Sequence, residues 1–155
     1  MHPYDDPAVI AGQGTLALEM LAAVPSLDTL VISVGGGGLI GGVAAAARAL
    51  RPEIEVVGVQ ARRFPAMYNA VKGASLPQGE STLADGMAVG RPGEITREMI
   101  SRLVSDVVLV DEHELQDAER SNGSSEIRSS LRCREYGRWP LWSKRQCRHC
   151  RCVPE

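Results

Sequence analysis

The chain has 155 residues, of which 44% are hydrophobic and 23% charged, and its formal net charge is −2. This charge averages two unlike pieces: residues 1–118 carry 8 Lys and Arg against 15 Asp and Glu, and residues 119–155 carry 9 against 4. The net charge therefore says nothing about partners. No apolar stretch reaches the roughly 18 residues of a membrane span, and none resembles a signal peptide. We expect neither a membrane nor a nucleic acid as a partner.

Apolar strand-like runs alternate with helical runs along the first 118 residues. Their periodicity predicts helices over 15–24, 39–50, 66–71 and 95–103, and strands over 30–34, 54–59 and 107–110. A turn at Gly12-Gln13-Gly14 is expected to open the first helix, and Pro25 to follow its end. The alternation favours an α/β fold with a parallel sheet that helices cover on both faces.

Four consecutive glycines, Gly35, Gly36, Gly37 and Gly38, stand between the strand over 30–34 and the helix over 39–50. A loop without side chains lets backbone N–H groups approach an anion closely. The following helix adds its unpaired N–H groups and the positive end of its dipole. Ligands of parallel sheets bind at the carboxyl ends of the strands, where this loop lies. The pattern predicts a phosphate site.

Two common phosphate motifs do not fit. A nucleoside triphosphate loop ends in Gly-Lys-Ser/Thr, whereas Gly38 is followed by Leu39 and Ile40. A dinucleotide site needs an acidic residue at the end of the next strand, but the strand over 54–59 runs into Gln60 and then Ala-Arg-Arg. A single phosphate, as in pyridoxal 5′-phosphate, is the remaining interpretation.

Three segments, Val9–Glu19, Ser33–Gly42 and Thr82–Gly86, resemble in order and spacing the threonine/serine dehydratase family of fold-type II pyridoxal-phosphate enzymes, to which serine racemase is related. Residues 2–7 and 107–115 extend this resemblance, which covers about residues 2–118. It implies part of a parallel, helix-covered sheet and pyridoxal 5′-phosphate as cofactor. It also implies that the phosphate lies on Gly35 to Gly38, and that Gly86 and Tyr4 lie near the cofactor ring.

The function implied by the resemblance is that of an L-threonine or L-serine ammonia-lyase, which forms a 2-oxo acid and ammonia. A serine racemase-like activity is one alternative. A truncated, non-catalytic product that only binds phosphate or pyridoxal 5′-phosphate is another. The parent enzyme is expected to be a cytoplasmic homo-oligomer that acts in amino-acid catabolism or isoleucine biosynthesis. Residues 1–118 contain no cysteine, as is usual for a cytosolic protein.

The residues that would perform the chemistry are missing from the matching segment. The chain has two lysines, Lys72 and Lys144, and neither stands where the family places the lysine that carries the cofactor. We therefore assign no catalytic residue. Some relatives bind a divalent cation, but the matching positions, Gln60 and Ala66, are not anionic and predict no metal there. His2 and His113 are expected to be surface residues.

Residues 119–155 differ in character from the rest. They contain all four cysteines, both tryptophans and no hydrophobic periodicity. We interpret them as a divergent basic tail that is frameshifted or disordered. The Cys147-x2-Cys150 pair lacks a second well-spaced pair, so we expect no zinc site.

Overall fold

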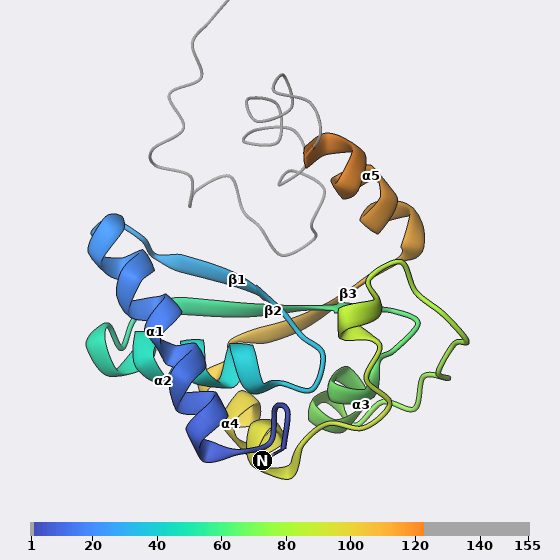
Figure 1. The fold of residues 1–155 in the computed structure, drawn as a ribbon, viewed down its shortest axis with the longest axis horizontal. Helices are drawn as coiled ribbons and strands as arrows, with labels where there is room; N and C mark the ends of the chain where they lie inside the picture. The colour runs from blue at the N-terminus through green and yellow to red at the C-terminus, as the bar shows by residue number, and fades with distance from the viewer. Residues whose placement is uncertain (1, 123–155) are drawn as a thin grey trace, which may run out of the picture. The chain divides into compact units, whose positions relative to one another are not determined.

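The computed structural model describes residues 2–122. Figure 1 shows the arrangement of its elements. In chain order these are α1 (Pro7–Ala23), β1 (Thr29–Ser33), α2 (Gly38–Leu50), β2 (Glu55–Ala61), α3 (Ala66–Lys72), the 3₁₀ turn η1 (Asp85–Met87), α4 (Glu94–Leu103), β3 (Asp106–Val110) and α5 (Glu112–Asn122). One compact unit, Met1–Glu112, contains everything from α1 to β3, and α5 continues into a second unit.

The three strands form one parallel sheet in the order β1-β2-β3. Leu30 pairs with Val56, and Gly58 pairs with Val107. Each crossover passes through helices, so the predicted α/β fold is confirmed. Strand ends differ from the prediction by one or two residues. Val34 lies just beyond β1, although its N–H still donates to the carbonyl of Val59 at 2.8 Å.

Helices bury one face of this sheet. Leu30 and Ile32 of β1 and Val56 of β2 join residues of α1, α2, α3 and α4 in a single apolar core. On the opposite face, Val31 is 48% exposed. The prediction of a sheet covered on both faces is therefore wrong for the residues described, because the buried and exposed positions alternate along β1.

Helix α1 begins eight residues before the predicted start, at Pro7. The Asp6 carboxylate caps it by accepting from the Ala8 N–H at 2.9 Å. The predicted Gly12-Gln13-Gly14 turn is therefore wrong, since these residues lie inside the helix. A Cβ on Gly42 of α2 would lie only 2.1 Å from the carbonyl oxygen of Ile10. Small residues are needed here because α1 and α2 pack backbone to backbone.

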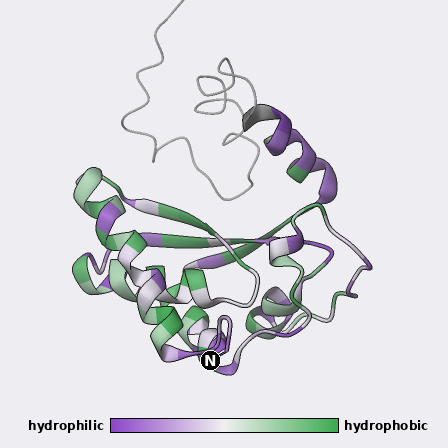
Figure 2. Ribbon diagram, in the orientation of Figure 1, coloured by the Kyte–Doolittle hydropathy of each residue, from purple (hydrophilic) through white to green (hydrophobic). Residues whose placement is uncertain are grey.

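Helix α5 is mostly hydrophilic, as Figure 2 shows. Its His113 and Asp117 side chains lie 3.1 Å apart, one helical turn from each other. Residues 119–122 of the predicted tail complete this helix. The interpretation of the remaining tail, including Cys147 and Cys150, falls outside the described residues. No helix in the described part of the chain is long and apolar enough to cross a membrane.

Candidate phosphate-binding site

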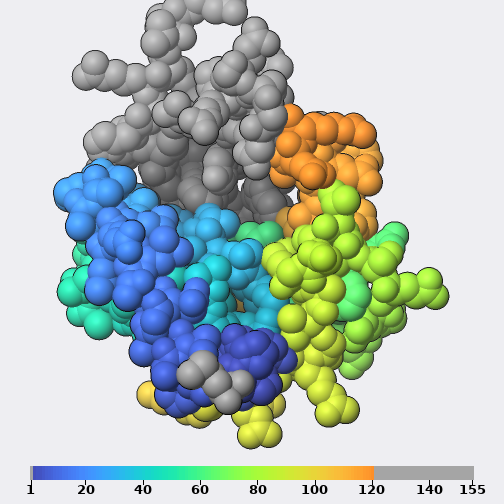
Figure 3. All heavy atoms as spheres, in the orientation of Figure 1, coloured from blue at the N-terminus to red at the C-terminus, as the bar shows by residue number. Residues whose placement is uncertain are grey.

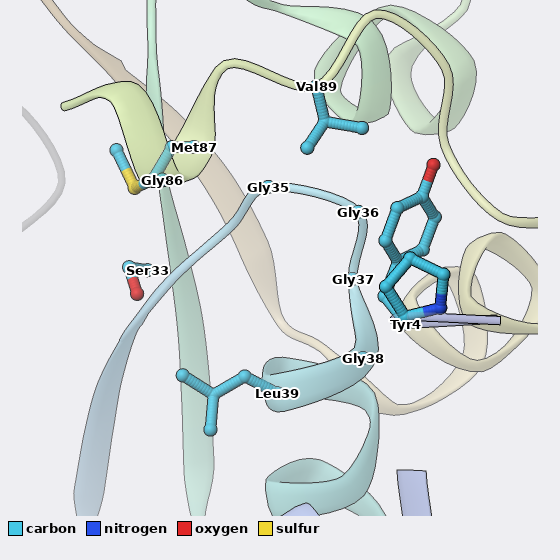
Figure 4. A pocket seen from close by; sticks show the side chains of 11 residues that line it. Tyr4, Ser33, Gly35, Gly36, Gly37, Gly38, Leu39, Gly86, Met87 and Val89 are labelled. Carbon is cyan, nitrogen blue, oxygen red and sulfur yellow. The ribbon is translucent and has the colours of Figure 1, made fainter. Parts of the chain in front are cut away.

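A pocket of about 330 Å³ lies where the chain leaves β1 and enters α2. Figure 4 shows the four glycines along it, with Tyr4 beside Gly36 and with Gly86 near Gly35. Figure 3 shows the surface hollowed between the dark blue N-terminal segment and the yellow-green stretch that contains Gly86. The structure thus brings together all six residues that the sequence assigned to the site: Tyr4, Gly35, Gly36, Gly37, Gly38 and Gly86.

Two of these glycines occupy positions that no side chain could share. A Cβ on Gly36 would lie 2.2 Å from Cγ of Tyr4, so the tyrosine ring packs directly on the backbone. Gly37 has a φ of +96°, and its Cβ would lie 2.7 Å from the terminal methyl of Met67. Left-handed backbone costs other residues roughly 1–2 kcal/mol. Bare backbone therefore forms this wall of the pocket.

The loop offers hydrogen-bond donors that the described residues do not use. Within the described part of the chain, no group accepts from the N–H of Gly35, Gly36 or Gly37. Gly38, Leu39 and Ile40 occupy the first turn of α2, where N–H groups have no partner inside the helix. No side chain caps this helix at Gly37. Open N–H groups at the positive end of a helix dipole favour an anion.

Tyr4 is held in place by the short segment that precedes α1. Its hydroxyl donates to the carbonyl of Arg91 at 3.0 Å. Nδ1 of His2 accepts from the Asp5 N–H at 3.0 Å, and the two rings of His2 and Tyr4 meet edge to face at 4.6 Å. His2 thus has a local structural contact, a role that the sequence reading did not give it.

The segment that carries Gly86 is anchored by Glu112. This carboxylate accepts from the Thr82 hydroxyl at 2.6 Å and from the Leu83 N–H at 2.8 Å. The bond from Thr82, then the bond from Leu83, lowers the pKa of Glu112 below its ordinary value. The anchored segment runs close to the glycine loop: a Cβ on Gly35 would lie 3.3 Å from the carbonyl oxygen of Gly86.

Five further residues line the pocket, and sequence reasoning missed them: Pro3, Ser33, Leu39, Met87 and Val89. Ser33 and Leu39 directly flank the glycine loop, so adjacency was a usable signal for both. Met87 is the last residue of η1 and Val89 follows it in an irregular stretch, and the sequence carries no periodic pattern for either. Pro3 comes with the N-terminal segment that positions Tyr4.

Lys72 does not belong to this site. Its Nζ lies 2.6 Å from Oδ1 of Asp106, the first residue of β3. The pocket lies at the carboxyl end of β1, whereas Asp106 is at the amino end of β3, where it pairs with Val57 in the interior of β2. The single lysine of the described residues is therefore paired and absent from the pocket lining.

Gln60, one of the two positions at which we predicted no metal, performs a structural task. It is fully buried, and its Oε1 accepts from the Tyr68 N–H in the first turn of α3 at 2.8 Å. Its Nε2 has no partner among the described residues. Ala66 begins α3 and offers no side-chain ligand. Within the described residues, no group of three His, Cys, Asp or Glu side chains could hold a metal ion.

A parallel α/β sheet with a bare glycine loop at the end of one strand defines a class of proteins that bind phosphate-bearing ligands. The chain matches the family described as pyridoxal-phosphate dependent enzymes over residues 1–126. It belongs to this family.

Two curated relatives agree with this family assignment. The chain is 44% identical over 120 residues to L-threonine ammonia-lyase of Thermotoga maritima, which covers 76% of this chain and 30% of that protein. It is 44% identical over 123 residues to L-threonine dehydratase catabolic TdcB of Escherichia coli K12, covering 75% and 36%. The chain thus spans about a third of the length of these curated relatives.

Two solved structures have the same fold. One is the threonine deaminase of T.th., with a TM-score of 0.72 and 36% identity, covering 77% of this chain and 45% of that one. The other is maize serine racemase, with a TM-score of 0.71 and 34% identity, covering 77% and 38%. Both agree with the resemblance to threonine/serine dehydratases and serine racemase.

Proposed function

We propose that the pocket binds pyridoxal 5′-phosphate, with its phosphate on the N–H groups of Gly35 to Gly38. The unused donors of the loop carry this proposal, together with family membership. Tyr4 and Gly86 flank the loop and are proposed to lie beside the cofactor ring. Phosphate suits the site because its oxygens accept several hydrogen bonds at once.

We further propose that the reaction of the whole protein is L-threonine or L-serine ammonia-lysis, which yields a 2-oxo acid and ammonia. The names of the two curated relatives support this choice. Pyridoxal 5′-phosphate supplies an electron-withdrawing group that makes the α-proton of an amino acid easier to remove. The contribution of this chain is to hold the phosphate and to exclude water beside it through Tyr4 and Val89.

A serine racemase-like activity is the second candidate, and the similarity to maize serine racemase supports it. The two reactions part after the α-proton is removed, so product analysis separates them: an ammonia-lyase releases a 2-oxo acid, and a racemase returns the other enantiomer. A third candidate is binding without turnover by this polypeptide. The absence of a lysine from the pocket lining supports it.

The cellular setting belongs to the same proposal. We propose a cytoplasmic homo-oligomer that acts in amino-acid catabolism or in isoleucine biosynthesis. The lack of cysteine over residues 1–118 agrees with a reducing compartment.

The test uses the 155-residue chain and a ligand pair that differs only in the phosphate. Pyridoxine 5′-phosphate and pyridoxine lack the aldehyde, so neither can react with Lys72 or Lys144. Calorimetric titration is expected to show the phosphorylated ligand binding at least about tenfold tighter, as the gain of one charge-assisted hydrogen bond requires. Inorganic phosphate should compete. Equal affinities for the two ligands would contradict the proposal.

A further inference from the structure

A buried hydroxyl lies behind the glycine loop. Thr96, in the first turn of α4, is fully buried, and its Oγ1 donates to the carbonyl oxygen of Gly36 at 2.7 Å. The N–H of Gly93 points to the same oxygen at 3.5 Å. Thr96 does not line the pocket, whereas Gly36 does. The hydroxyl therefore holds the loop from outside the ligand space.

The position of Thr96 is itself fixed by Asp5. One carboxylate oxygen of Asp5 accepts from the Thr96 N–H at 3.1 Å, and the other accepts from the Glu94 N–H at 2.9 Å. Asp5 thus caps α4 although the two are far apart along the chain. Gly93 allows this approach, because a Cβ there would lie 2.3 Å from Oδ1 of Asp5. Thr96 can move little along the axis of α4.

The hydrogen bond from Thr96 to the Gly36 carbonyl also fixes the direction of the Gly37 N–H. The carbonyl of Gly36 and the N–H of Gly37 belong to one trans peptide unit, so they point in opposite directions. With the carbonyl directed at Thr96, the N–H of Gly37 points away from Thr96. No described group accepts from that N–H. A peptide unit between two glycines has little steric resistance to rotation, so an external hydrogen bond is needed to fix it.

We propose that Thr96 is a positioning residue for the phosphate site: its hydroxyl fixes the Gly36–Gly37 peptide so that the Gly37 N–H faces the phosphate. This rests on the proposed function of the pocket. Without the hydroxyl the peptide can rotate and turn the carbonyl oxygen toward the ligand. An oxygen dipole facing an anion repels it, whereas the N–H binds it.

The experiment compares variants of the full chain by calorimetric titration with inorganic phosphate and with pyridoxine 5′-phosphate. Thr96→Val keeps the shape of the side chain and loses the hydroxyl, and it is expected to weaken both ligands about tenfold, as for the loss of one hydrogen bond to a charged group. Thr96→Ser is expected to restore wild-type affinity. Thr15→Val is the matched control, because the Thr15 hydroxyl also donates to a glycine carbonyl, that of Gly12 at 2.9 Å, but within α1.

The outcomes separate this inference from the proposed function. If the wild-type chain binds neither ligand, the proposed function fails and this inference fails with it. If the wild type binds and Thr96→Val binds equally well, only the inference is overturned. Amide hydrogen exchange adds a readout that needs no variant. The Gly37 N–H should exchange quickly in the free chain and become protected by phosphate, and protection already present without phosphate would overturn the inference.

Discussion

The turns that follow the carboxyl ends of β1 and β2 differ in whether a side chain accepts a hydrogen bond from the first turn of the helix that comes next. At the end of β2, the buried Gln60 reaches over to accept from the Tyr68 N–H of α3. At the end of β1, α2 begins with glycines and has no side-chain cap. The starts of α1 and α4 are also occupied, by Asp6 and Asp5. We therefore expect an anion to bind only at the helix start whose N–H groups are left unpaired.

The glycine loop between β1 and α2 offers backbone N–H groups, but the pocket lining beside it holds no lysine. The purified chain with added pyridoxal 5′-phosphate is expected to show no threonine or serine dehydratase turnover, because a placed acid–base group is worth about 10²–10⁴-fold and the pocket lining lacks a lysine. Release of 2-oxobutyrate or pyruvate is the assay. Steady release that Lys72→Ala abolishes would show that a lysine outside the pocket carries the reaction.

A side chain added to the glycine loop is expected to lower both stability and phosphate affinity. Gly37→Ala combines strained backbone with overpacking against Met67 and Thr96, and it should destabilise the fold by about 2–5 kcal/mol. Phosphate affinity should fall with it. Gly12→Ala is the matched control, because nothing lies within 4 Å of its Cβ in the interior of α1, and it should stabilise by about 0.5–1 kcal/mol. Denaturant unfolding measures both, and equal behaviour of the two variants would refute the account of the loop.

The occupied turn is tested by Gln60→Leu. Loss of the acceptor leaves the Tyr68 N–H unpaired, while removal of the orphaned Nε2 offsets part of that loss. The net destabilisation should be about 1–2 kcal/mol. Phosphate affinity should stay within about twofold, since no hydrogen bond joins Gln60 to the loop. The exposed Gln13→Leu is the control. A large drop in phosphate affinity for Gln60→Leu would mean that the two turns are not independent.

Glu112 anchors the segment that carries Gly86, and its substitution is expected to change the free energy of unfolding only slightly. Its pKa is lowered in the folded state, so its contribution is present above the ordinary carboxyl pKa and is lost as the pH falls through the folded value. Glu112→Gln should cost about 0.5–1 kcal/mol at pH 7 and progressively less below about pH 4.5. Unfolding curves across this range measure the difference. Glu98→Gln, in an exposed ion pair with Arg102, should change little, and a pH-independent cost for Glu112→Gln would contradict the assignment.

Local patterns in the sequence predicted the strands, α2, the glycine loop and the family. They did not predict features that depend on a contact with a residue far away in the chain. Gly12 and Gly14 have the composition of a turn, yet α1 continues through them because it packs closely on Gly42. The partners of Gln60 and Thr96 lie on other elements, so no spacing rule reveals them. The exposed face of β1 escaped prediction because the exposed Val31 is as apolar as its buried neighbours Leu30 and Ile32.

We expect that, among the helix starts of α1 to α4, only the start of α2 is open to an anion. An amide NMR titration of the ¹⁵N-labelled chain with inorganic phosphate tests it most directly. The resonances of Gly35, Gly36, Gly37 and Gly38 should shift saturably, while those of Tyr68 and Thr96 in the first turns of α3 and α4 should respond much less. Shifts centred on Tyr68 or Thr96, or no saturable shift at the glycines, would contradict it.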